Sequence, residues 1–182
     1  DVEARMNPVI THDVLNQAEP LVGANLFAGN RALQDALRFN RPGVDVQRFT
    51  ALGAEAGSAA MQQHARLANV HKPQLRTHDR FGHRIDEVEF HPSYHALMAV
   101  ATGAGLHATP WARGRGAHVE RAAACMLFTE LEPSMLCPIS MSYAVAPALR
   151  ANPAIHADWF DRLASTTYDP RLVPFADKPG LT

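Results

Sequence analysis

The sequence has few of the features that mark secreted, membrane or disulfide-rich proteins. Its 182 residues include only two cysteines, Cys125 and Cys137, too few for the disulfide framework of a secreted domain. No apolar run approaches the roughly 18 residues of a membrane span, and positions 1–8 lack the charged-then-apolar pattern of a signal peptide. Because free thiols suit a reducing compartment, we expect a cytoplasmic protein without membrane contact.

A surplus of charge of either sign is also lacking. Seventeen Lys and Arg residues face eighteen Asp and Glu residues, a formal net charge of -1, so the whole chain has no electrostatic attraction for nucleic acid. The apolar fraction of 47% and the charged fraction of 19% are typical of a globular protein rather than a disordered one. A chain of this length can bury a core without a metal or a disulfide.

The pattern of apolar residues predicts a mainly α-helical bundle with one short extended hairpin. Residues 1–29 are interrupted by prolines and glycines, and we expect them to form an irregular segment that wraps over the rest. Residues 30–165 predict the helical domain, and residues 166–182 predict an extended linker. Within the domain, helices are expected over residues 30–40, 45–70, 92–103, 117–131, 133–150 and 153–163, with the hairpin at residues 74–90.

The segment 135–149 is the most informative structural signal. It is apolar on nearly all sides, so as a helix it has no solvent face and must be buried in the bundle or under another domain. Hydroxyl groups lie within it at Ser140, Ser142 and Tyr143. Such groups either bond back to helix carbonyls or line a pocket for the polar end of a ligand.

No complete catalytic, metal or nucleotide motif is present. His91 and His95 have the i, i+4 spacing of a metal pair, but Pro92 follows His91, which is better placed as a helix cap. Cys125 is expected to pack in the core, and Cys137 to lie inside the buried helix. Residues 113–116, Arg-Gly-Arg-Gly, resemble a phosphate loop only superficially and predict a flexible connection between helices.

Several sequence blocks resemble the alkylation-response AidB branch of the flavin-dependent acyl-CoA dehydrogenases. These blocks are residues 25–27 (Asn-Leu-Phe), 67–70 (Leu-Ala-Asn-Val), 87–95 (Glu-Val-Glu-Phe-His-Pro-Ser-Tyr-His) and 136–141 (Leu-Cys-Pro-Ile-Ser-Met). The segment around Glu87 to Pro92 is the most specific of them. The similarity covers nearly the whole chain.

The resemblance implies the amino-terminal helical domain of a three-part subunit, with residues 166–182 leading into a β domain. FAD would be held mostly by the other two parts, together with the carboxylate base that acts on an acyl-CoA-type substrate. The segment formed by Ser140, Met141, Ser142 and Tyr143 would be one wall of the substrate and flavin cavity. We therefore expect no catalytic residue, no metal and no bound FAD in this chain alone.

The resemblance also implies a homo-oligomer, tetrameric in the family, and duplex DNA binding through a carboxy-terminal domain. One alternative function is therefore that of a DNA-binding, DNA-protecting stress protein in which dehydrogenation is secondary. A second is a free-standing helical interaction domain whose apolar helix binds a protein partner.

Overall fold

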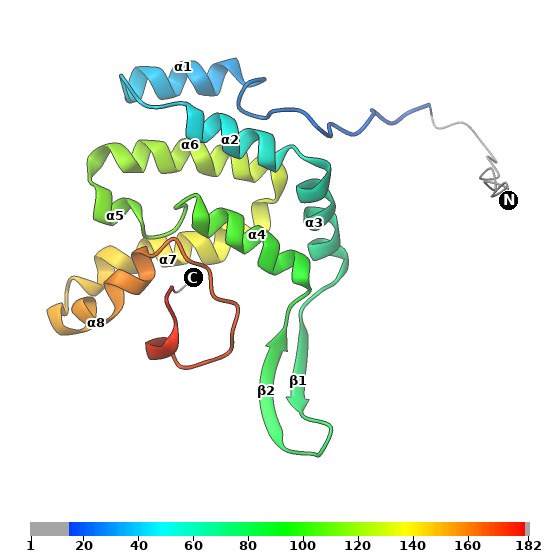
Figure 1. Ribbon diagram of the computed structural model, residues 1–182, viewed down its shortest axis with the longest axis vertical. Coiled ribbons are helices and arrows are strands. Elements are labelled where there is room, and N and C mark those ends of the chain that lie inside the picture. The colour runs from blue at the N-terminus through cyan, green and yellow to red at the C-terminus, as the bar shows by residue number, and fades with distance from the viewer. Residues whose placement is uncertain (1–14, 181–182) are drawn as a thin grey trace, which may run out of the picture.

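The computed structural model describes residues 15–180, which fold into a mainly α-helical body with one projecting β-hairpin (Figure 1). This confirms the predicted fold class. The α-helices are α1 (Arg31–Asn40), α2 (Gln47–Ala56), α3 (Ala59–Val70), α4 (Pro92–Gly103), α5 (Pro110–Arg113), α6 (Arg115–Leu131), α7 (Leu136–Leu149) and α8 (Pro153–Ala164). The strands are β1 (Gln74–His78) and β2 (Arg84–Glu89), and two short 3-10 helices are η1 (Pro133–Met135) and η2 (Phe175–Asp177).

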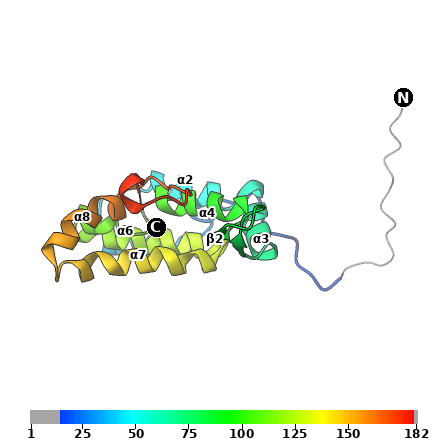
Figure 2. The same cartoon turned by 90° about the horizontal axis from the view of Figure 1, so that it is seen from below.

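Helix α6 is the central element of the body. It packs against α1, α2, α3 and α5, while α3 packs on α4 and α7 on α8. Figure 2 shows a flat arrangement with α2 and α4 on one side and α7 along the other. The core between these helices contains the fully buried side chains Phe49, Leu97, Leu127, Phe128 and Ile139. Within residues 15–180, none of the helices has both the length and the apolar character to cross a lipid bilayer.

Several helices begin where a side chain accepts a hydrogen bond from a free backbone N–H group. Asn30 accepts from Leu33 at α1, and Asn152 accepts from Ile155 at α8. At α4, the His91 ring accepts from Ser93 N, with Pro92 at the first helical position. These caps satisfy N–H groups that the helix itself cannot pair, and they confirm the predicted starts of the three helices.

The single helix predicted over residues 45–70 is wrong, because the chain breaks into α2 and α3 at Gly57 and Ser58. The Ser58 hydroxyl accepts from Met61 N at 3.2 Å and starts α3 anew. The carbonyl of Gly57 accepts from Gly23 N at 2.7 Å, and that of Gly53 accepts from Leu26 N at 3.1 Å. The amino-terminal segment therefore bonds to carbonyl groups at the end of α2.

Two irregular segments flank the helices. Residues 15–29 contain no helix or strand, yet Leu26 and Phe27 enter the core with 6% and 2% of their surface exposed. The part of the predicted wrap before residue 15 lies outside the described residues. Residues 165–180 are irregular except for η2. Buried His107 bonds to the Ser165 carbonyl at 2.7 Å, and the Thr109 hydroxyl donates to the Ala164 carbonyl at 2.9 Å, so the end of α8 is anchored to the body.

The hairpin confirms the extended excursion predicted around residues 74–90. Its strands are antiparallel, with Leu75 opposite Val88 and Arg76 opposite Glu87. Asp79 closes the turn by accepting from the N–H groups of Phe81 and His83. Every residue of both strands is exposed, and the hairpin extends away from the helices (Figure 1).

A candidate cavity wall on helix α7

Helix α7 is buried on one side only. Ile139, Ser142 and Ala146 are buried, at the i, i+3, i+7 spacing of one helix face. The opposite side is exposed and consists of small or apolar residues, namely Cys137, Ser140, Met141, Ala144 and Ala148. Met141 alone has 68% of its surface exposed. The bundle therefore does not bury α7 completely, and Cys137 is exposed on the side that the bundle leaves open.

The four predicted site residues divide between these two sides. Ser140 and Met141 lie on the exposed face, whereas Ser142 is buried and Tyr143 is half-buried. This division follows from helix geometry, because successive residues are rotated by about 100° and four in a row cannot share one face. The structure therefore brings Ser140 and Met141 together on the exposed surface, while Ser142 faces the bundle.

Tyr143 is held by three side chains from α5 and α6. Its hydroxyl lies 2.9 Å from Nδ1 of His118, and the guanidinium carbon of Arg121 lies 3.8 Å from the centroid of its ring. Arg121 also donates to the Ser140 hydroxyl at 3.3 Å. A cation over an aromatic face is attractive, so Arg121 links α6 to α7 through both residues.

The third contact is made by Trp111, and it compensates for a proline in α7. Pro147 is the residue whose N–H would normally bond to the Tyr143 carbonyl, but proline has no N–H. The indole N–H of Trp111 donates to this carbonyl at 2.8 Å in its place. The carbonyl therefore stays paired, and α7 continues to Leu149 in spite of the proline.

The exposed face of α7 offers an apolar surface and almost no reactive chemistry. Ser140 supplies its one hydroxyl, and Cys137 is a thiol in the first turn of the helix. The face lacks a carboxylate or histidine to move a proton, and Arg121, which reaches its edge, is engaged by the Ser140 hydroxyl and the Tyr143 ring. It suits contact with hydrocarbon, and it does not supply the groups that would bind the phosphates of FAD.

The histidine pair considered as metal ligands does not form a metal site. The His91 ring stacks on His71 with centroids 4.5 Å apart, whereas Nδ1 of His95 lies 2.7 Å from the Tyr168 hydroxyl. Among residues 15–180, no group of three or more His, Cys, Asp or Glu side chains has the arrangement of a metal site.

The remaining candidates from the sequence have structural positions. Cys125 packs against the core, as predicted, and burial raises the pKa of its thiol. Burial also disfavours the thiolate that a nucleophile would need. The segment 113–116 joins α5 to α6, with Gly114 as the single residue between the two helices.

Sequence reasoning missed Trp111 and Arg121 as the residues that position α7. One signal for Trp111 was present, since Pro147 within a helical segment leaves a carbonyl four residues earlier without a partner and calls for a donor. Nothing in the sequence indicates that this donor comes from a residue more than thirty positions away.

Comparison with known proteins places this fold in a family. Residues 16–170 match the family model described as the Adaptive response protein AidB N-terminal domain. The chain is 38% identical over 174 residues to the Escherichia coli (strain K12) protein named "Putative acyl-CoA dehydrogenase AidB". That match covers 94% of this chain and 32% of the relative, so the chain spans about a third of the relative's length.

Solved structures share this fold. The structure described as Bd2924 in its apo form superposes with a TM-score of 0.71 at 26% identity, covering 81% of this chain and 31% of that one. The Caenorhabditis elegans ACDH-11 structure, in complex with C11-CoA, has a TM-score of 0.63 at 17% identity, covering 86% and 29%; at that identity the likeness shows the fold alone. The match over residues 16–170, supported by the sequence identity to the E. coli protein, shows that this chain belongs to the AidB N-terminal domain family.

Proposed function

We propose that this chain is the amino-terminal domain of an FAD-dependent, acyl-CoA-dehydrogenase-type oxidoreductase, and that α7 forms one wall of its substrate and flavin cavity. The observation that carries the proposal is the exposed face of α7. Ser140 and Met141 contribute side chains to this wall, whereas Ser142 and Tyr143 hold the helix against the bundle. An acyl-CoA-type substrate and FAD would be bound mainly by parts of the protein beyond this chain.

Two features support this assignment. First, exposing the apolar face made of Met141, Ala144 and Ala148 to water is unfavourable, so covering it by hydrocarbon or protein lowers the free energy. Second, the relative in E. coli carries the name "Putative acyl-CoA dehydrogenase AidB", and it is about three times as long as this chain. A domain that supplies a surface but no acid, base or phosphate-binding group fits a cavity completed by other domains.

The test uses the intact protein, with the sequence continued past Thr182 to its natural end. We expect it to purify yellow with bound FAD, and residues 1–182 to be colourless. Met141→Glu places a charge on the wall. The rate at which acyl-CoA thioesters reduce the flavin should fall at least about tenfold, because a carboxylate is costly to bury without a partner. The control is Met126→Glu, since Met126 is comparably exposed on α6 with 57% of its surface accessible.

An intact protein that neither contains FAD nor can be reconstituted with it would overturn the proposed function. Equal activity in the two glutamate variants would leave the enzyme class standing but would remove α7 from the cavity.

We also propose that the hairpin is part of a homo-oligomer interface. Leu75, Phe81 and Val88 expose 64%, 71% and 42% of their surfaces, and an isolated two-stranded hairpin is at best marginally stable in water. Arg76 of β1 already pairs with Glu89 of β2 at 2.6 Å within the hairpin. A second copy placed across a two-fold axis would cover the apolar side chains.

Analytical ultracentrifugation of the intact protein tests the role of the hairpin. Replacing residues 75–88 by a short glycine-containing turn should lower the oligomer mass, and the double variant Leu75→Ser with Val88→Ser should weaken association more than Phe39→Ser, which alters an exposed side chain of α1. An unchanged mass in both hairpin variants would exclude the hairpin from the interface.

The two alternative functions make different predictions. A DNA-protecting protein requires salt-sensitive duplex binding by the intact protein, and the wall variant Met141→Glu should leave that binding unchanged. A free-standing interaction domain requires that residues 1–182 associate stably through α7, so that Met141→Glu abolishes the association. The flavin content of the intact protein separates both alternatives from the enzyme.

A further inference from the structure

A second surface of the molecule carries a concentration of positive charge that the overall composition hides. It lies where α2, α4, α5 and α6 converge around a pocket of about 250 Å³. Arg48 from α2 and Arg113 from α5 line this pocket, together with Phe49, Leu52 and Ala124. We call it the Arg48–Arg113 pocket.

The charges around the pocket are not balanced. Arg48 donates to Glu120 at 2.7 Å, and Arg41 donates to the other oxygen of the same carboxylate at 3.3 Å. Both oxygens of Glu120 are therefore occupied by guanidinium groups. Within residues 15–180, no carboxylate forms an ion pair with Arg113, and Asp45 is the other acid close enough to act on the charge of Arg48.

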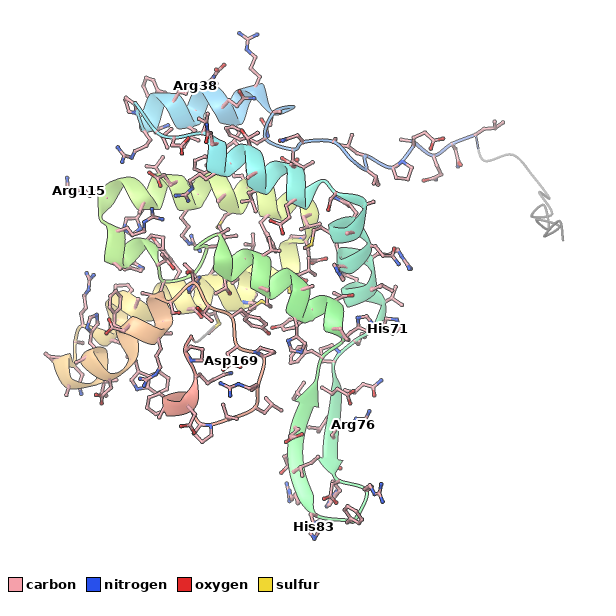
Figure 3. The ribbon with its side chains drawn as sticks, viewed as in Figure 1. Arg38, His71, Arg76, His83, Arg115 and Asp169 are labelled. Atoms are coloured by element: carbon pink, nitrogen blue, oxygen red, sulfur yellow. The ribbon has the colours of Figure 1, made fainter. Side chains whose placement is uncertain are left out.

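The position of α6 adds to this surplus. Arg41 lies over the first turn of α6, so closely that a Cβ atom at Gly116 would be 2.4 Å from its Nε atom. Arg115 is the first residue of α6 and points outward at the corner between α5 and α6 (Figure 3). The pocket is thus lined by two guanidinium groups, those of Arg48 and Arg113, and the Glu120 carboxylate beside it is shared between Arg48 and Arg41, in a chain whose net charge is -1.

The charge on Arg48 is disfavoured in this pocket. Burial is the main cause that lowers the pKa of Arg48; attraction by Glu120 opposes it, and repulsion from Arg113 adds a smaller lowering effect. An anion placed between the two guanidinium groups would relieve the repulsion and accept their free N–H donors. Beneath it, Phe49 and Leu52 offer an apolar floor.

We propose that the Arg48–Arg113 pocket binds a phosphate group attached to a small apolar or planar body. The two guanidinium groups pair with the phosphate oxygens, and the attached body lies against the floor. The pocket volume corresponds to about eight water molecules at roughly 30 Å³ each. That space admits one phosphorylated ring but not a whole nucleotide cofactor. This site is independent of the cavity wall on α7.

The test is titration calorimetry on the intact protein with two probes, inorganic phosphate and phenyl phosphate. Phenyl phosphate should bind about fivefold more tightly, because its ring covers apolar surface that inorganic phosphate leaves in water. Arg113→Gln should weaken phenyl phosphate binding about tenfold, and Arg113→Lys less, because a lysine keeps the charge without the planar pair of donors. Arg38→Gln is the matched control, since Arg38 is an exposed arginine on α1 near Asp35. It should change affinity less than about twofold.

A competition experiment identifies the source of the phosphate. If duplex DNA displaces phenyl phosphate from the unaltered protein and Arg113→Gln weakens DNA binding, the phosphate belongs to a nucleic acid backbone. If DNA does not compete, the ligand is a small phosphorylated molecule.

Two results would overturn the proposal. One is equal affinity for phenyl phosphate in Arg113→Gln and Arg38→Gln. The other is no saturable binding of either probe together with a lower unfolding temperature for Arg113→Gln, which would show that a carboxylate elsewhere in the intact protein already occupies the pocket.

Discussion

The contact between Trp111 and the Tyr143 carbonyl yields the most incisive test of how α7 is held. Trp111→Phe removes the indole N–H and keeps an aromatic ring. The Tyr143 carbonyl then has no donor, because Pro147 has no N–H that could replace the indole. Losing the hydrogen bond costs about 1 kcal/mol, and leaving a partly buried carbonyl unpaired costs about 1 to 3 kcal/mol more. We expect the free energy of unfolding to fall by about 2 to 4 kcal/mol.

Pro147→Ala provides the matched background. Alanine restores the N–H that donates to the Tyr143 carbonyl within the helix, so Trp111→Phe should cost about 1 to 3 kcal/mol less when residue 147 is alanine. Urea unfolding followed by far-ultraviolet circular dichroism gives the four stabilities of this double-mutant cycle. Trp159→Phe is the control, because the Trp159 ring stacks on Phe175 and should cost the same in both backgrounds. If Trp111→Phe also costs the same in both, the carbonyl is not what Trp111 satisfies.

Three further predictions concern the buried His107, the carboxy-terminal segment, and the contact between α2 and the amino-terminal segment. Burial lowers the pKa of His107, so its ring stays neutral in the folded state while the unfolded chain gains a proton. Stability should therefore fall as pH drops below about 6.5, and His107→Gln, which keeps a donor for Ser165, should flatten this part of a urea-derived stability curve. Hydrogen bonds from Arg171 lower the pKa of Asp169 to about 2. The stability it contributes is complete above about pH 4 and lost as pH falls toward about 2. Acid titration should show a smaller loss in that window for Asp169→Asn, and an identical profile would contradict this. Gly57→Ala would place a Cβ atom 1.7 Å from the Ala24 carbonyl oxygen, and should cost about 2 to 4 kcal/mol in chemical denaturation. Gly103→Ala, which meets open space, should be neutral or slightly stabilising, so equal losses in the two glycine variants would refute the steric argument.

Short sequence patterns predicted much of the fold, because the structure forms the helix caps and turns that these patterns indicate. Asn30, His91 and Pro92 have the chemistry of helix starts, and the structure uses them in that way. Asp79 and Gly82 likewise mark the hairpin turn, where Gly82 adopts a positive φ of 88°. The break between α2 and α3 was missed although Ser58 is a local cap; the hydrogen bonds that Gly23 and Leu26 donate to the carbonyls of Gly57 and Gly53 come from a distant segment and could not be predicted.

The candidate site was only partly predictable for a different reason. Apolar residues on all sides of α7 identify it as a helix that should be covered, but they do not select which face the bundle buries. That choice depends on Ile139 and Ala146 fitting the neighbouring helices. The Arg48–Arg113 pocket could not be predicted because its two arginines are more than sixty positions apart in the sequence. The net charge of -1 gives no indication of a local excess of positive charge.

The position of residues 23–27 has a practical consequence for shortening the protein. A version that starts at the first helix would omit Phe27, whose ring lies 5.6 Å from that of Phe49, and would open a hole in the centre of the core. It would also remove the hydrogen bonds that Gly23 N and Leu26 N donate to the carbonyls of Gly57 and Gly53. Expression boundaries should therefore precede Gly23, because the irregular leader is as much a part of the folded unit as the helices are.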